Sequence, residues 1–351
     1  MRRTAIVLLL FCILLSGCSN PYVSSYVSVK PYEDQWNLTG IESVTVTDGK
    51  QLYDTLRSTV NDGVERVAIT GFTFSRDVVD HAMKQAIDRL MQEDPIANYA
   101  VRNITYEWGK TGDKPALAVE IHYSRNRSEL SQIKRLQDNE EANNAVIAAL
   151  TQCESGLVFQ VLEDEGTDYV RTAERFAREN PDQVMELPQI TMNVYPDSGS
   201  HRVVELRFFY QTDREALLTM KEQVEPVFTS AVLYVSGDAQ QEEKYHQLHS
   251  FLMERYEYQL DTSITPAYSL LHHGVGDSKA FASVYAVMCR RSGLECETVS
   301  GTKRGESHSW NMIYVDGSYY HLDLLEGDFH LRTDEQMNGY VWDYSAYPVY
   351  K

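Results

Sequence analysis

One set of landmarks recurs 87 residues later in the first two thirds of the sequence, and this repeat constrains the fold more than any other feature. The landmarks are Tyr123, Arg127, Leu130 and Lys134, which return as Tyr210, Arg214, Leu217 and Lys221. In each copy a short apolar run leads to an amphipathic helix and then to two alternating segments typical of a hairpin. The pattern predicts two related α+β modules, over residues 43–144 and 145–232. Because the identities are few, two unrelated strand-and-helix segments stay an alternative.

The two predicted modules carry no recognisable catalytic motif. Neither contains a glycine-rich phosphate loop, a paired metal-ligand motif or a nucleophile elbow. We therefore expect them to be binding or spacing domains.

The amino terminus has the three parts of an export signal. Arg2 and Arg3 supply a positive start, Ala5 to Leu15 form an apolar run, and the sequence Leu-Ser-Gly-Cys ends the signal at Cys18. This tetrad resembles the lipobox of bacterial lipoproteins, in which the cysteine receives a diacylglycerol group before the signal is cut. The alternative is an ordinary membrane anchor, but an apolar run of 11 residues is shorter than the ~20 that a transmembrane helix needs.

The lipobox resemblance implies a signal peptide over residues 1–17 and attachment to a membrane through the lipid on Cys18. The protein would then lie at the extracytoplasmic face of the cell membrane. Residues 18–42 contain Ser, Pro and Tyr without a clear period, so we expect a tether there.

Charge and cysteine content limit the partners further. The sequence has 51 acidic and 32 basic residues and a formal net charge of -19, so its surface repels nucleic acid and anionic lipid headgroups. Of the five cysteines, Cys12 leaves with the signal and Cys18 takes the lipid. Cys153, Cys289 and Cys296 remain, an odd number without metal-ligand spacing. We predict buried thiols, no bound metal, no cofactor and no nucleic-acid partner.

A third region, residues 233–351, has a different order of elements. Helices are predicted over residues 240–258 and 278–292, and Gly293 ends the second of them. Strands are predicted at 295–301, 307–315 and 318–324. The pair Asp316–Gly317 is a strong signal for a hairpin turn between the last two strands.

Two stretches of this region resemble the transglutaminase-like family of papain-fold proteins, over residues 240–330. They are GVGDSKAFASVYAVMCRRSGLECETVSG and SHSWNMIYVDGSYYHLDLL. In that family a cysteine opens a helix, a histidine lies on the next strand, and an aspartate follows the hairpin turn. The resemblance implies that His308 and Asp323 occupy the histidine and aspartate positions, and counting back from Gly293 places Ser278 in the nucleophile position. The expected fold class is α+β, with a C-terminal papain-like domain after the two modules.

Serine changes the chemistry expected at this position. A cysteine reacts as its thiolate, and a helix N-terminus beside an imidazolium lowers the thiol pKa well below ~8.5. A hydroxyl is too weak an acid for this effect, so His308 would have to act as a true general base for Ser278. Asp277 either caps the helix or adds a negative charge that disfavours an alkoxide, and both interpretations point away from catalysis.

Other residues fit the nucleophile position less well. Cys289 lies 11 positions after Ser278, ~16 Å further along the helix axis, and cannot reach the same site. A metal site is the other alternative, and it would use His321 and Asp323 on one strand face with His308 across from them.

Three functions stay open for the third region. The first is a non-catalytic domain, whose papain-like cleft binds a peptide, a glycan or a partner protein at the cell surface. The second is an acyl transferase or amide hydrolase that uses Ser278, His308 and Asp323. The third is a structural spacer at the surface. The missing cysteine favours the first, so we predict a pseudoenzyme.

Overall fold

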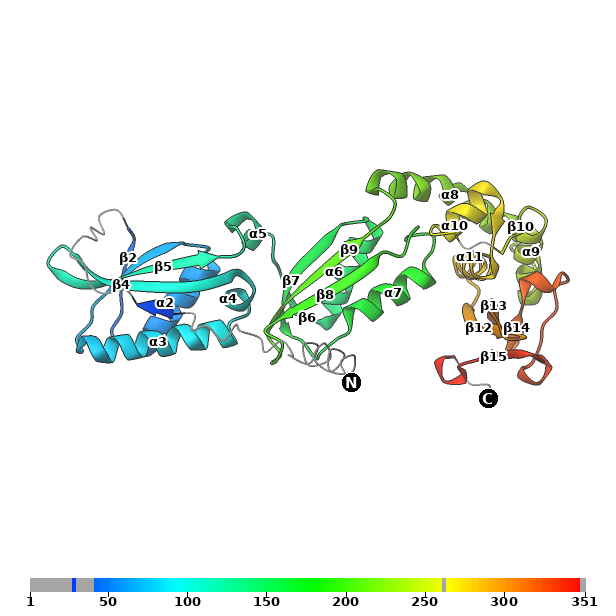
Figure 1. The fold of residues 1–351 in the computed structure, drawn as a ribbon. Coiled ribbons are helices and arrows are strands. Elements are labelled where there is room, and N and C mark those ends of the chain that lie inside the picture. The colour runs from blue at the N-terminus through cyan, green and yellow to red at the C-terminus, as the bar shows by residue number, and fades with distance from the viewer. Residues whose placement is uncertain (1–26, 30–40, 261–262, 348–351) are drawn as a thin grey trace, which may run out of the picture. The chain divides into compact units, whose positions relative to one another are not determined.

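The computed structural model describes residues 27–29, 41–260 and 263–347 (Figure 1). The chain divides into two compact units. The first takes in the chain up to Lys134 together with Tyr195–Val203, and the second takes in Arg135–Val194 and Val204–Lys351. The predicted signal peptide and Cys18 lie outside the described residues. No described helix is long and apolar enough to cross a membrane.

The first unit is built on a five-stranded sheet with the order β1-β4-β5-β3-β2. Its elements are β1 (Val27–Val29), β2 (Ser43–Thr45), α2 (Gly49–Asn61), β3 (Arg66–Thr70), α3 (Arg76–Glu93), α4 (Pro95–Ala100), β4 (Val101–Thr111), β5 (Lys114–Tyr123) and α5 (Arg127–Ser131). Strand β1 pairs in parallel with β4, so the predicted tether over residues 18–42 contains a strand. Three residues are too few to show a period, which is why the sequence does not indicate this strand.

The second unit begins with a four-stranded sheet of the order β6-β7-β9-β8. Its elements are β6 (Lys134–Asp138), α6 (Asn139–Thr151), β7 (Gly156–Glu163), α7 (Tyr169–Glu179), β8 (Gln189–Tyr195), β9 (Arg202–Phe209) and α8 (Arg214–Tyr234). Apart from β1, this order repeats that of the first sheet, with β6, β7, β8 and β9 in the places of β2, β3, β4 and β5.

The repeat inferred from the sequence agrees with this common topology. Asn126 caps α5 and Asp213 caps α8, and the two caps are 87 positions apart, in the same register as the sequence landmarks. The predicted boundary between residues 144 and 145 needs correction, because it falls inside α6. The second sheet starts with β6, which pairs with β7, so the second module begins before that boundary.

The rest of the second unit contains a bundle of helices and a sheet of the order β14-β13-β12-β15. Its main elements are α9 (Gln241–Met253), β10 (Glu257–Tyr258), α10 (Pro266–Tyr268), the π-helix η1 (Ser269–His273), β11 (Val275–Gly276), α11 (Ser278–Arg291), β12 (Cys296–Lys303), β13 (Glu306–Val315), β14 (Ser318–Leu322) and β15 (Tyr340–Trp342). The predicted hairpin turn is present, since Asp316 and Gly317 both have positive φ. The helix predicted over residues 240–258 ends at Met253. The last two residues of the predicted range form β10, which pairs with β11.

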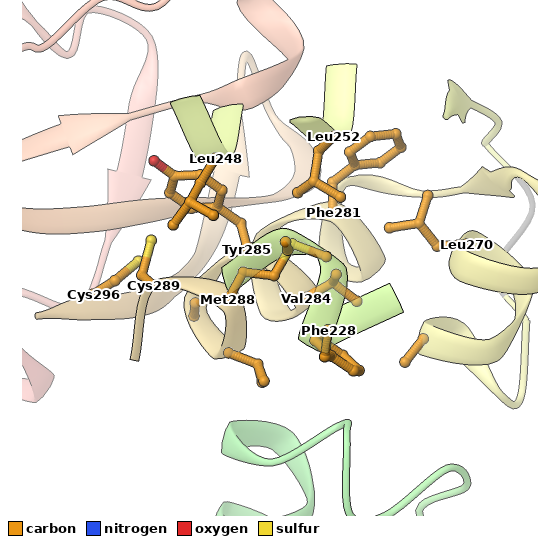
Figure 2. Close-up of a cluster of buried hydrophobic side chains, with 14 of the residues drawn as sticks. Phe228, Leu248, Leu252, Leu270, Phe281, Val284, Tyr285, Met288, Cys289 and Cys296 are labelled. Carbon is orange, nitrogen blue, oxygen red and sulfur yellow. The ribbon is translucent and has the colours of Figure 1, made fainter. Parts of the chain in front are cut away.

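Helix α11 is the centre of the hydrophobic core of this unit. Figure 2 shows side chains of neighbouring elements around it, with Phe228 on α8, Leu248 and Leu252 on α9, Leu270 on η1 and Cys296 on β12. The same cluster includes Leu217, near the start of α8. Helix α8 therefore runs without interruption from the second module into the core of the C-terminal region. The predicted boundary between residues 232 and 233 leaves α8 with the second module, although its buried residues belong to the C-terminal cluster and the sheet of that module has a separate cluster of its own.

Candidate functional site

Ser278 is the first residue of α11, as the sequence predicts. The helix starts here because Asp277 has extended backbone geometry and its carboxylate accepts the N–H of Ala280 at 2.8 Å. Gly276 permits the tight approach to this helix end, since a Cβ at Gly276 would lie 3.0 Å from the Cβ of Ala280. The Ser278 Oγ accepts the backbone N–H of Ser309 at 3.2 Å, which places the serine beside the strand residue that follows His308.

Strand β13 is held against α11 by a buried amide. Asn311 is fully buried, and its Nδ2 donates to the carbonyl oxygen of Ala282 at 2.8 Å. Gly301 of β12 lies between two strands, since it pairs with His308 of β13 on one side and with Trp342 of β15 on the other. A Cβ at Gly301 would lie 2.2 Å from the carbonyl oxygen of Val341, so only glycine allows β15 to approach the strand beside His308.

Asp323 directly follows β14 and is 4% exposed. Its Oδ2 accepts a hydrogen bond from His308 Nε2 at 2.8 Å, and its Oδ1 accepts the backbone N–H of Leu325 at 3.1 Å. Because His308 donates to this carboxylate through Nε2, Nδ1 is the ring nitrogen that remains for a partner at position 278. The structure therefore joins His308 to Asp323 and places Ser278 beside Ser309, the residue that follows His308.

Two further donors converge on the same carboxylate oxygen. Lys303 Nζ donates to Asp323 Oδ2 at 2.9 Å, and the Tyr340 hydroxyl donates to it at 2.6 Å. Lys303 also forms an ion pair with Glu326, and Glu326 in turn pairs with Arg332 at 2.5 Å. No local sequence pattern indicates that this network is part of the site. Lys303 and Tyr340 are 20 and 17 positions from Asp323, and they meet it only because β12, β14 and β15 belong to the same sheet.

The electrostatics of the network favour its charged forms. Burial alone would raise the pKa of Asp323, but hydrogen bonds from His308, Tyr340 and Lys303 hold it well below its ordinary value. Hydrogen bonds from Lys303 and Arg332 lower the pKa of Glu326 to about 2. Burial disfavours the Lys303 ammonium, but its hydrogen bonds to Glu326, Tyr340 and Asp323 outweigh that effect and raise its pKa. The carboxylate of Asp323 is thus ionised and shared between an imidazole and an ammonium.

A second imidazole lies in the same sheet, and its two nitrogens are both engaged. The indole Nε1 of Trp310 donates to His321 Nδ1 at 2.9 Å, and His321 Nε2 bonds to Asp334 Oδ1 at 2.8 Å. Because an indole can only donate, Nδ1 must be an acceptor, so the proton of the neutral ring is on Nε2. Burial lowers the pKa of His321 and favours this neutral form. His321 therefore does not join Asp323 in a metal site, and the described residues contain no group of three or more ligands that could hold one.

The three described cysteines do not provide another nucleophile. Cys153, Cys289 and Cys296 are free and buried, as predicted. Burial raises the pKa of the Cys289 thiol well above its ordinary value and also raises that of Cys153. A thiol reacts as its thiolate, and the raised pKa values of Cys153 and Cys289 favour their unreactive protonated form.

Comparison with known proteins supports the fold of this region. A family model described as the transglutaminase-like superfamily matches residues 230–324. Curated proteins gave no match. Among solved structures, a TGase is 11% identical over 64% of this chain and 65% of its own, with a TM-score of 0.28. A protein described as a cysteine protease from Cytophaga hutchinsonii is 13% identical over 44% of this chain and 65% of its own, with a TM-score of 0.29.

A third structure, described as a protease from Parabacteroides distasonis, is 11% identical over 60% of this chain and 49% of its own, with a TM-score of 0.24. This chain thus spans about two thirds or less of the length of the structures it matches. Because all three TM-scores are below 0.5, the assignment rests on the family match and on the order of elements around α11. Residues 230–324 form a domain of the transglutaminase-like superfamily.

Proposed function

We propose that the transglutaminase-like domain is a non-catalytic binding domain of an extracytoplasmic lipoprotein, and that it binds a peptide, a glycan or a partner protein at the cell surface. The observation that carries this proposal is the start of α11. By the family resemblance Ser278 has a hydroxyl in the position of the family's thiol, and the carboxylate of Asp277 accepts a hydrogen bond from the N–H of Ala280 at that helix end.

The Asp277 cap matters because its negative charge offsets the partial positive charge of the helix N-terminus, which would otherwise activate a nucleophile. The first turn of a helix carries a partial positive charge, which stabilises an anion placed there. Asp277 supplies that anion one residue before Ser278, so an alkoxide at Ser278 would be a second negative charge at the same place. The Ser278 hydroxyl also accepts a backbone N–H, which fits a structural hydroxyl as well as a reactive one.

A fluorophosphonate probe tests the proposal, because it labels serines that are activated by a neighbouring base. We expect the wild-type protein to show no more labelling than Ser278→Ala. Ser345→Ala, which removes an exposed serine far along the chain, is the matched control. Labelling of the wild type and of Ser345→Ala that is lost in Ser278→Ala would overturn the proposal.

The second candidate function is acyl transfer or amide hydrolysis by Ser278. The bond of 2.8 Å between His308 and Asp323 favours it, since an orienting carboxylate is what a general-base histidine requires. The same labelling experiment decides between the two functions. An active serine would also lose its labelling in His308→Ala.

The lipid anchor is the second part of the proposal and rests on the sequence around Cys18. We expect an alkyne-tagged fatty acid fed to cells to label the wild type and Cys12→Ala. Cys12 is the matched control, since it lies in the same apolar run but outside the Leu-Ser-Gly-Cys tetrad. Cys18→Ala should lose the label and leave an uncut precursor, and a labelled, processed Cys18→Ala protein would contradict the assignment.

A further inference from the structure

We infer that Lys303 helps to hold the site in its silent state, because its ammonium shares with His308 the carboxylate oxygen that would support an imidazolium there. This inference rests on the proposed function and deepens it. The site differs from a thiolate-imidazolium site in two ways. One is the serine at position 278, which is visible in the sequence, and the other is the cation behind the histidine.

The position of the ammonium is fixed by several partners. Lys303 Nζ and His308 Nε2 lie 2.9 and 2.8 Å from the same oxygen, Asp323 Oδ2. The ammonium also pairs with Glu326 and lies 5.2 Å from the ring centre of Tyr340. The Lys303 side chain is only 23% exposed, so water screens its charge weakly.

The Lys303 ammonium disfavours a thiolate-imidazolium pair because it bonds to the same carboxylate as the His308 imidazole. A thiolate-imidazolium pair places a positive charge on the histidine, and a second positive charge on the same carboxylate oxygen opposes it. The charged and titratable groups that face this point come from every neighbouring element. They are Lys303 of β12, His308 and Glu306 of β13, Asp323 and Glu326 after β14, Arg332, and Tyr340 of β15.

The test restores the thiol and then varies the cation. Ser278→Cys is compared with Ser278→Cys/Lys303→Met and Ser278→Cys/Lys303→Arg, and the thiolate at position 278 is followed by its ultraviolet absorbance against pH, with the wild type subtracted. We expect Ser278→Cys alone to hold little thiolate at neutral pH. Removing the ammonium should raise that fraction up to about tenfold, since a neighbouring charge shifts a titration by about one unit or more. Lys303→Arg keeps the charge and should stay at the level of Ser278→Cys.

Two controls separate charge from structure. Tyr340→Phe in the Ser278→Cys background removes a neutral donor from the same oxygen, so it should change the thiolate fraction much less than Lys303→Met does. Thermal unfolding shows which variants are folded, and Lys303→Gln replaces Lys303→Met if the latter does not fold.

Two outcomes would overturn the inference. One is a thiolate titration that is the same with and without Lys303. The other is a Ser278→Cys thiol that is already ionised at neutral pH with Lys303 in place. Neither outcome affects the non-catalytic proposal, which fails only if wild-type Ser278 is labelled by the fluorophosphonate.

Discussion

The two modules have the same strand order but differ in the helix that comes after the last strand. In the first module β5 leads to α5, a five-residue helix with no buried residue. In the second module β9 leads to α8, a 21-residue helix with four buried residues. Both helices begin in the same way, with an Asn or Asp cap 87 positions apart. The difference therefore lies in the apolar face of the helix and in the elements against which that face packs.

This difference shows how one repeat can be a separate unit while the other becomes part of a larger one. Leu217, Val224 and Phe228 of α8 lie in the same buried cluster as the residues of α11. Arg291, near the end of α11, also donates to Asp182 at 2.7 Å, which ties the C-terminal domain to the segment after α7. Helix α8 therefore packs into the core of the transglutaminase-like domain, whereas the sheet of the second module keeps a separate buried cluster with α6 and α7.

The largest expected effect compares the equivalent leucines of the two repeats. Leu217 is 1% exposed in the core around α11, whereas Leu130 is only partly buried on α5. We expect Leu217→Ala to destabilise the second unit by about 2–5 kcal/mol, because it leaves a cavity. Leu130→Ala should cost less than about 1 kcal/mol. Hydrogen exchange of peptides from α11 and from α3, measured in denaturant, reports the two units separately. Equal losses in the two variants would mean that α8 does not contribute to the core around α11.

A smaller effect concerns pH and a buried histidine of the second unit. His249 of α9 is 5% exposed, and within the described part of the chain its Nε2 has no hydrogen-bond partner. Burial, with a smaller effect of His246 opposed by Asp328, lowers its pKa to about 4. The unfolded chain takes up the proton near the ordinary value of ~6.5, so stability is lost as the pH falls from ~6.5 toward 4.

Between pH 7 and 5 we expect this group to lower the free energy of unfolding by about 1–2 kcal/mol. His249→Phe should remove that part of the pH dependence, and His246→Gln, at a half-exposed position, is the control. Denaturant titrations at the two pH values make the measurement. A pH dependence that is unchanged in His249→Phe would exclude this histidine as its source.

The smallest effect compares the equivalent tyrosines Tyr123 and Tyr210. The hydroxyl of Tyr123 donates to the carbonyl oxygen of Val64 at 3.1 Å, whereas that of Tyr210 is buried and has no partner among the described residues. Tyr123→Phe should cost about 1 kcal/mol, since it removes a hydrogen bond. Tyr210→Phe should be neutral or slightly stabilising, because it removes an unsatisfied group. Equal costs would show that Tyr210 has a partner in solution.

Local signals in the sequence predicted the parts of the site that local chemistry determines. The cap at Asp277, the end of α11 before Gly293 and the turn at Asp316–Gly317 each depend on neighbouring residues. The family motif added His308 and Asp323, which the structure places 2.8 Å apart. The lipid on Cys18 stays a prediction.

The parts that could not be predicted from the sequence depend on contacts between distant segments. No local pattern marks Lys303, because its role arises only when β12 and β14 bring it to Asp323. The extension of α8 into the next core was missed for the same reason. An apolar helix face predicts burial but does not say which neighbour covers it.

The shared helix also bears on how this protein could have been assembled during evolution. The sequence match to the superfamily begins at residue 230, near the end of α8. A recombination event at that point would separate α11 from Leu217, Val224 and Phe228, and would expose apolar surface on both products. The second module and the transglutaminase-like domain should therefore be inherited together, while the first module can be gained, lost or exchanged more freely.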